Sequence, residues 1–159
     1  MIILGIDPGS SRIGYGAIEK DKKIRLITYG TINISPKSEN EKLAEAVSAF
    51  IQLLDQIQPS LVAIEKIYFS KNRKTGIAVA QTRGAFISEI QKRGILCEEY
   101  GPTTVKKIVT GYGHSDKKAV MKMVALSLGI PSVQGYDDAA DALAIALTAA
   151  YQPPYQPRG

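Results

Sequence analysis

ILGIDPGSSRIGYGAI, residues 3–18, is the stretch that decides the fold. ILGID is apolar up to its last residue, as expected of a buried strand, and Asp7 stands where Pro8 and Gly9 break the backbone. IGYGAIEK, residues 13–20, predicts a second strand, and IRLITYGTINI, residues 24–34, predicts a third after a short charged turn. The short connections favour an antiparallel meander that leaves Asp7 at the end of the first strand.

Further along the chain, helical and strand patterns alternate. Residues 35–59 carry apolar residues with a 3.6-residue period and predict a helix ended by Pro59. LVAIEKIYF, residues 61–69, is a near-continuous apolar run, which is typical of a parallel central strand covered on both faces. We expect this strand to lie beside the first.

The second half of the chain adds one more strand and four helices. A helix over 74–94, stopped by Gly94, precedes a fifth strand, ILCEEY, at 95–100. Three helices follow at 103–111, begun by Thr103 or Thr104, at 115–130, capped by Ser115, and at 137–151. This order predicts an α/β fold, a five-stranded mixed sheet with helices on both faces, in the ribonuclease H-like order of elements.

Composition excludes several classes of protein. The 159 residues are 45% hydrophobic and 22% charged, and no apolar run approaches the roughly 20 residues of a membrane span. We expect one domain over 1–151 and an extended, proline-rich tail over 152–159. The apolar start is too short for a signal peptide, and a single cysteine forms no internal disulfide, so we expect a cytoplasmic protein.

The positive charge is concentrated in the middle of the chain. The net charge is +5, but residues 66–122 hold twelve Lys and Arg against four acids, while the rest of the chain is net acidic. Clustered Lys and Arg bind phosphate backbones by releasing condensed counterions. The distribution favours a nucleic-acid partner over a uniformly solvated surface.

Two acids stand at strand positions. Asp7 follows the first strand, and strand ends are where ligands bind in open α/β sheets, although an aspartate before a turn is commonly structural. Glu65 interrupts an otherwise apolar strand, and a buried carboxylate is costly unless it is paired or binds a metal. Glu65 is therefore the acid whose position calls for a chemical role.

Two more acids begin the last helix. Asp138 and Asp141 are three residues apart and project from one face near the helix N-terminus. Acids in a first turn also complement the helix dipole, and either Asp137 or Asp138 could be the cap. Because the apolar run ALAIAL after Asp141 must pack on the sheet, we expect the pair to face inward.

Together the four acids predict a metal centre. Neighbouring strands are about 4.8 Å apart, so Asp7 and Glu65 could share one cation with the helix pair closing the other side. Carboxylate ligands without a Cys or His cluster select magnesium or manganese. Two such ions would activate a water and stabilise the leaving oxygen of a phosphodiester.

Five motifs carry a family resemblance. ILGIDPGSSRIGYGAI, AIEKIYFSKN, QTRG, EEYGPTTVKKIVTGYGHSDKKAV and DDAADALAIA resemble the RuvC-type Holliday junction resolvases up to about residue 151. The resemblance implies a magnesium-dependent endodeoxyribonuclease, with Mn²⁺ as a substitute, that resolves four-way junctions in recombination and repair. It implies paired symmetric nicks with 5′-phosphate ends, and Asp7, Glu65, Asp138 and Asp141 match the catalytic, metal-binding acids.

The resemblance also implies roles for basic and aromatic residues. Lys106 and Lys117 match lysines near the scissile phosphate, where a cation offsets developing charge, and Lys107 and Lys118 are the nearest alternatives for this role. Tyr68 matches an aromatic that stacks on an unpaired base, with Phe69 as the alternative. The remaining residues predicted to contact DNA are basic: Arg73, Lys74, Arg83, Lys107 and Lys118.

Partners follow from symmetry and from the family. A four-way junction has approximate two-fold symmetry, which favours a homodimer, and the small residues Ala78, Ala80, Gly84 and Ala85 are our candidate interface. The family implies cooperation with a branch-migration helicase complex (RuvA and RuvB).

Three other interpretations stay open. One is an RNA-processing nuclease of the same fold, and another is a silent junction-binding module. The third is an actin-like ATPase with Gly9, Ser10 and Ser11 around phosphate, for which the chain is short of a second half-domain.

Overall fold

The computed structural model describes residues 1–35, 38–67 and 73–152, and the side chains of all of these except 73 and 74. The elements run in the order β1 (Ile2–Asp7), β2 (Arg12–Lys20), β3 (Ile24–Asn33), α1 (Glu39–Ile57), β4 (Leu61–Glu65), α2 (Arg73–Lys92), β5 (Leu96–Tyr100), α3 (Pro102–Thr110), α4 (Lys117–Leu128) and α5 (Asp137–Tyr151). Apart from Gln152, the predicted tail falls outside the described residues.

The five strands form one mixed sheet in the order β3-β2-β1-β4-β5. β1, β2 and β3 make the predicted antiparallel meander, while β4 and β5 run parallel to β1. Ile6 of β1 lies opposite Ile64 of β4, so β1 and β4 end side by side. The prediction that β4 neighbours β1 is confirmed, and so is the fold class.

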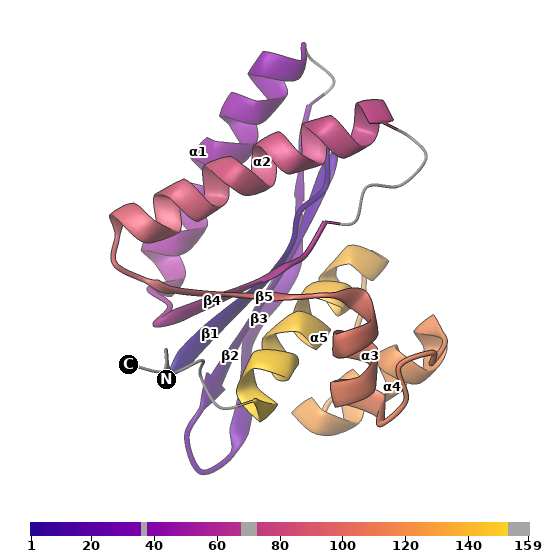
Figure 1. Ribbon diagram of the computed structural model, residues 1–159. Coiled ribbons are helices and arrows are strands. Elements are labelled where there is room, and N and C mark those ends of the chain that lie inside the picture. Colours follow the sequence, from indigo (N-terminus) through magenta and orange to yellow (C-terminus); the bar gives the residue numbers. More distant parts are fainter. Residues whose placement is uncertain (36–37, 68–72, 153–159) are drawn as a thin grey trace, which may run out of the picture.

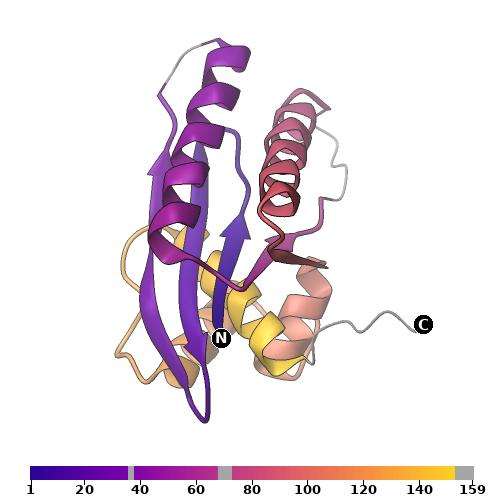
Figure 2. The same cartoon turned by 90° about the vertical axis from the view of Figure 1, so that its left-hand side faces the viewer.

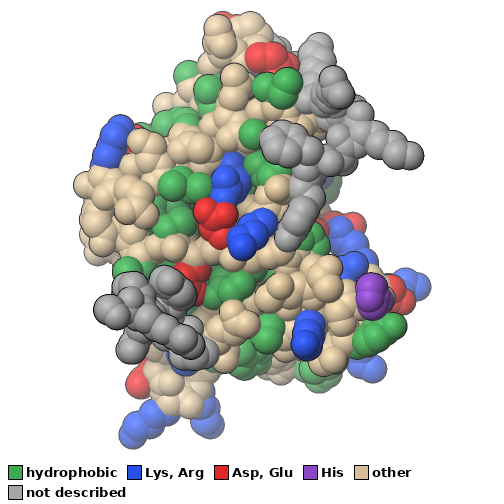
Figure 3. Space-filling view, in the orientation of Figure 1, with side chains coloured by type: hydrophobic (Ala, Val, Ile, Leu, Met, Phe, Trp, Pro, Cys, Tyr) green, Lys and Arg blue, Asp and Glu red, His purple; other side chains and the backbone are tan. Residues whose placement is uncertain are grey.

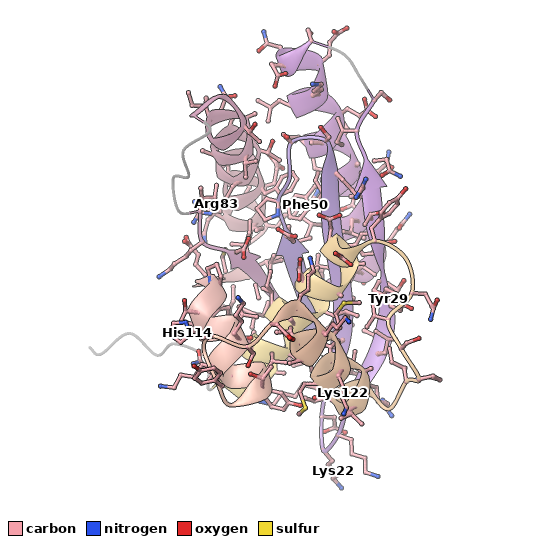
Figure 4. The ribbon with its side chains drawn as sticks, turned by 90° about the vertical axis from the view of Figure 1, so that its right-hand side faces the viewer. Lys22, Tyr29, Phe50, Arg83, His114 and Lys122 are labelled. Carbon is pink, nitrogen blue, oxygen red and sulfur yellow. The ribbon has the colours of Figure 1, made fainter. Side chains whose placement is uncertain are left out.

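Helices cover both faces of the sheet. α1 and α2 pack on one face, and α3, α4 and α5 lie on the other (Figures 1 and 2). On the first face, Phe50 of α1 and Phe86 of α2 stack with ring centroids 4.0 Å apart, and Figure 4 shows Phe50 within this layer. Among the described residues, no helix has both the length and the apolar character needed to cross a membrane.

Two predicted helix starts are wrong, for local reasons. α3 begins at Pro102 rather than at Thr103 or Thr104, because proline's fixed φ suits the first helical position after an extended Gly101. α4 is capped by Asp116 rather than Ser115: the Asp116 carboxylate accepts a hydrogen bond from the Ala119 amide at 2.8 Å. The Ser115 hydroxyl instead donates to the Tyr112 carbonyl at 2.8 Å.

α5 is the central helix of its layer. Its residues from Ala142 to Ala150 are all buried, and it contacts β1, β2, β3, β4 and β5. It runs back across the sheet, so that its N-terminal end meets the ends of β1 and β4 (Figure 1). The ends of two strands and one helix are therefore brought together at one place.

Candidate active site

Strand alternation turns both strand acids toward α5. In β1, Ile3 packs in the α5 layer and Leu4 and Ile6 pack in the α1–α2 layer, so Asp7 faces α5. In β4, Leu61 and Ala63 face α5 and Ile64 faces the other way, so Glu65 also faces α5. The two carboxylates therefore lie on one face at the ends of paired strands.

Glycines let α5 approach this face closely. A Cβ on Gly5 would stand 2.0 Å from the Ala142 carbonyl oxygen, and a Cβ on Gly14 would stand 2.0 Å from the Asp138 carbonyl oxygen. Gly14 is opposite Asp7 in the β1–β2 register. Because Gly5 and Gly14 have no side chains, the start of α5 packs directly beside Asp7. This packing also brings Asp138 and Asp141 close to Asp7.

Burial and the neighbouring acids raise the pKa values of both strand acids. Burial, and then the charges of Glu65, Asp141 and Asp138, raises the pKa of Asp7 to about 7. Burial and the charge of Asp141 raise the pKa of Glu65, while a hydrogen bond with Asp7 opposes this rise. A cation placed here would relieve the repulsion and favour the ionised carboxylates.

Asp141 is partly neutralised by a lysine. Burial raises the pKa of Asp141, and Lys117 opposes that rise. The Lys117 ammonium lies 3.1 Å from an Asp141 oxygen and 3.2 Å from an Asp137 oxygen. Burial lowers the pKa of Lys117, but these two partners reverse the effect and raise it, so Lys117 stays charged at the site.

Asp138 is held by an arginine. The Arg12 Nη1 donates to Asp138 Oδ2 at 3.0 Å, and the guanidinium carbon lies 3.6 Å from the centroid of the Tyr136 ring. Tyr136 is the N-cap residue of α5 and makes no side-chain capping bond. Asp137 and Asp138 both lie inside the first turn, so neither acid is the cap.

A pocket of about 240 Å³ opens beside the acids. Glu65, Asp141, Lys106 and Lys117 line its polar side. Its apolar wall is formed by Pro102, Val105, Val120, Ala144 and Ile145. The structure therefore brings both predicted catalytic lysines to the same cavity as two of the acids.

The donor set fits a hard divalent cation in its chemistry. All four acids offer oxygen ligands, as magnesium and manganese prefer. Among the described residues, however, no three acids, histidines or cysteines are already arranged to hold a metal ion. The Asp138 carboxylate is paired with Arg12, and the Asp141 carboxylate is paired with Lys117.

Three other residues predicted to contact DNA lie on three different helices. Lys107 and Lys118 are exposed on α3 and α4, and neither lines the pocket. Arg83 lies on α2 and forms an ion pair with Glu99 of β5. Figure 3 shows acidic and basic side chains next to one another in the middle of one face, and Figure 4 shows where Arg83 lies.

Some predicted positions cannot be located. Tyr68 and Phe69 lie outside the described residues, as do the side chains of Arg73 and Lys74.

His114, the single histidine of the chain, is exposed in the loop before α4 and makes an edge contact with Tyr112, with ring centroids 5.6 Å apart. Figure 4 places His114 at the outer edge of the molecule.

Sequence reasoning missed several residues that shape the site. Arg12 and Asp137 contact the acids or their lysine, and Gly5, Gly14 and Gly16 give α5 its seat. A signal was present, since glycines at alternate strand positions together with an alanine-rich helix indicate close packing of helix on sheet. For Arg12 no comparable signal exists, because its partner is 126 residues away in the chain.

Comparison with known proteins finds one family over nearly the whole chain. The family model described as crossover junction endodeoxyribonuclease RuvC matches residues 3–149. A protein of that name from Chloroflexus aggregans is 39% identical over 156 residues, covering 97% of this chain and 95% of the relative.

Solved structures give the same result. The RuvC structure from Thermus thermophilus superposes with a TM-score of 0.85 at 31% identity, covering 95% of this chain and 94% of that one. T. thermophilus RuvC in complex with a Holliday junction substrate matches with the same TM-score and coverage at 28% identity.

Proposed function

The chain belongs to the RuvC family of crossover junction endodeoxyribonucleases, and from this membership we propose that its four converging acids cut DNA with the help of magnesium. The protein is a Holliday junction resolvase. The observation that supports the proposed centre is the convergence itself: Asp7 and Glu65 end paired strands, and glycines bring the α5 acids to them. We take β1 to α5, residues 1–151, as one nuclease domain.

We assign the four acids to metal binding. Asp7, Glu65, Asp138 and Asp141 would hold two magnesium ions, with manganese as a substitute. Bound there, the ions would supply an activated water and charge stabilisation for an in-line displacement at phosphorus. Since Asp7 has a pKa of about 7, its ionisation is incomplete near neutral pH and a bound cation would drive it to completion.

We assign the lysines to the phosphate. Lys106 and Lys117 line the pocket beside Glu65 and Asp141, so a phosphate bound there would have ammonium groups within reach. Fixed positive charges stabilise the negative charge that develops on phosphate oxygens in the transition state. Lys107, Lys118, Arg73 and Lys74 would contact the backbone farther from the cut.

We propose that the enzyme acts as a homodimer on a junction in the cytoplasm, with the branch-migration helicase complex as its partner. α2 is suited to the dimer contact, because Ile77 is 56% exposed and Gly84 has open space around it. Gly84→Glu should convert the dimer to monomers in sedimentation equilibrium, while Gln56→Glu on the exposed side of α1 should not. A Gly84→Glu protein that stays dimeric would remove α2 from the interface.

Cleavage of defined substrates tests the activity. The purified protein is incubated with a labelled mobile four-way junction, a linear duplex and an RNA hairpin, each with magnesium or with chelator. We expect symmetric nicking confined to the junction and dependent on magnesium. Cleavage of the RNA hairpin in preference to the junction would favour an RNA-processing nuclease instead.

Asp7→Asn separates the metal role from binding. The substitution keeps the size of the side chain but removes an anionic ligand, so we expect junction binding to persist while cleavage falls by at least about a hundredfold. Asp55→Asn, on the exposed face of α1, is the matched control and should cleave at the normal rate. Equal cleavage by the two variants would exclude Asp7 from the centre.

A further inference from the structure

Arg12 links two elements that are far apart in the chain. It begins β2, and its guanidinium reaches across to the first turn of α5. There Nη1 contacts Asp138 Oδ2 at 3.0 Å, and the guanidinium carbon lies 3.6 Å from the centroid of the Tyr136 ring. The Arg12 side chain is 37% exposed and that of Asp138 33%, so the ion pair is only partly open to solvent.

The glycines of β2 explain why Arg12 is the residue that reaches α5. Along β2, Gly14 and Gly16 face α5 and have no side chains, because the helix lies against them. Arg12 is the next residue toward the start of β2 on the same face of the strand. Its side chain is therefore the first one on that face of β2 that can reach the beginning of α5.

The contacts of Arg12 leave one of its hydrogen-bond donors unsatisfied. Its Nε is buried and has no hydrogen-bond partner. A buried donor without a partner is unfavourable, so this position of the side chain is not the one that best satisfies the guanidinium. The position is instead held by the Asp138 carboxylate and the Tyr136 ring.

We propose that Arg12 is a positioning residue that holds Asp138 against β2 and competes with divalent metal ions for its carboxylate, thereby lowering the affinity of the acidic centre for metal. The inference rests on the proposed metal function of Asp138. A cation bound by Asp138 must either displace Nη1 from Oδ2 or share the carboxylate with the guanidinium, which places two positive charges on one carboxylate group, where they repel each other.

Lys117 does not make the same contact. It pairs with Asp137 and Asp141, on the side of the helix turn that faces α4 and the pocket. Arg12 approaches from β2. The two basic residues thus hold different acids, and removal of Arg12 leaves the Lys117 contacts in place.

Direct metal binding tests the proposal without DNA and without cleavage. Binding of Mn²⁺ to the full-length protein is measured by electron paramagnetic resonance of the free ion. We expect Arg12→Gln to bind Mn²⁺ about three- to fivefold more tightly, since a partly exposed ion pair stabilises by up to the equivalent of about a fivefold change in affinity. Arg12→Lys, which keeps the charge, should stay within about twofold of the unchanged protein.

Arg25→Gln is the matched control for charge. Arg25 pairs with Glu19 at 2.9 Å near the other end of the β2–β3 ribbon, so the substitution removes the same charge far from the acids. We expect no change in Mn²⁺ affinity for this variant. Equal affinities for Arg12→Gln and Arg25→Gln, or weaker binding by Arg12→Gln, would overturn the proposal.

Tyr136→Leu provides a second route if Arg12→Gln does not fold. It removes the ring beneath the guanidinium but keeps every charge, so Asp138 should be released more readily and Mn²⁺ should bind about twofold more tightly. Unchanged binding by a folded Tyr136→Leu protein would also count against the proposal. Absence of Mn²⁺ binding by the unchanged protein is a different result, because it would contradict the metal centre itself.

Discussion

Gly14→Ala tests whether the close packing of α5 on β2 positions the acids proposed to bind metal. The added Cβ would stand 2.0 Å from the carbonyl oxygen and 2.4 Å from the carbonyl carbon of Asp138, both of them backbone atoms. Since Cβ atoms essentially never come within 3.0 Å of such atoms, the first turn of α5 must move away from β2 by about 1 Å. Asp138 and Asp141 must move with it.

Two effects of different size should follow. Forcing an extra methyl group into a packed contact costs about 1–3 kcal/mol of unfolding free energy, which lowers the urea midpoint by about 1 M. A catalytic group misplaced by about 1 Å slows chemistry by about a hundredfold. Single-turnover cleavage of a four-way junction in magnesium measures the second effect, and urea titration measures the first.

Gly16→Ala separates position from stability. Its Cβ would meet the Leu143 side chain at 2.6 and 2.7 Å, which can turn aside. It would also meet the Leu143 backbone nitrogen at 2.9 Å, which requires a much smaller backbone shift than the 2.0 Å contact at Gly14. We expect a loss of about 1 kcal/mol in unfolding free energy, with cleavage slowed less than about tenfold. If the Gly14→Ala protein cleaves within threefold of the normal rate, close packing of α5 on Gly14 does not position the acids for cleavage.

Three further changes test other parts of the structure. Burial first, and then the neighbouring acids, raises the pKa of Asp7 from 3.8 to about 7, so the folded chain binds more protons than the unfolded chain in this window. In chelator, the unfolding free energy should therefore fall as the pH rises from about 4 to about 7. Asp7→Asn should reduce that fall in urea titrations, and parallel profiles would contradict the assignment. Phe86→Ala should lower the unfolding free energy by about 3–5 kcal/mol, and a double-mutant cycle with Phe50→Ala should give a coupling of about 1 kcal/mol; strict additivity would contradict the stack. Lys117→Gln should slow junction cleavage by about a hundredfold, whereas Lys22→Gln, in the exposed turn between β2 and β3, should not; equal rates for the two would exclude a special role for Lys117.

The sheet was predictable because its signals are local. The apolar strands and their short connections indicated the meander, and the continuous apolar run around Glu65 indicated a central parallel strand, as β4 proves to be. Helix starts were less predictable, since Ser115 and Asp116 are both good caps by residue type. Only the backbone of the loop decides which side chain reaches the free amide groups.

The acids were also predictable, but their surroundings were not. Glu65 was conspicuous because a carboxylate in an apolar strand requires a chemical reason. Nothing local to Arg12 indicates that it meets Asp138, since that contact depends on how α5 crosses β2. Ion pairs between distant segments depend on tertiary packing, for which a single sequence carries no periodic pattern.

The burial of α5 has a consequence for motion. From Ala142 to Ala150 every residue is buried, so we expect amide hydrogens in this stretch to exchange with solvent only when the whole domain opens. The start of the helix differs, because Tyr136 provides no side-chain cap and Asp137 is exposed, so we expect the amide hydrogens of Asp137 and Asp138 to exchange earlier. Asp138 thus lies at the border between the slowest-exchanging part of the protein and an earlier-exchanging helix end, and β2 restricts its motion twice, through the packing of its backbone on Gly14 and through the ion pair of its carboxylate with Arg12.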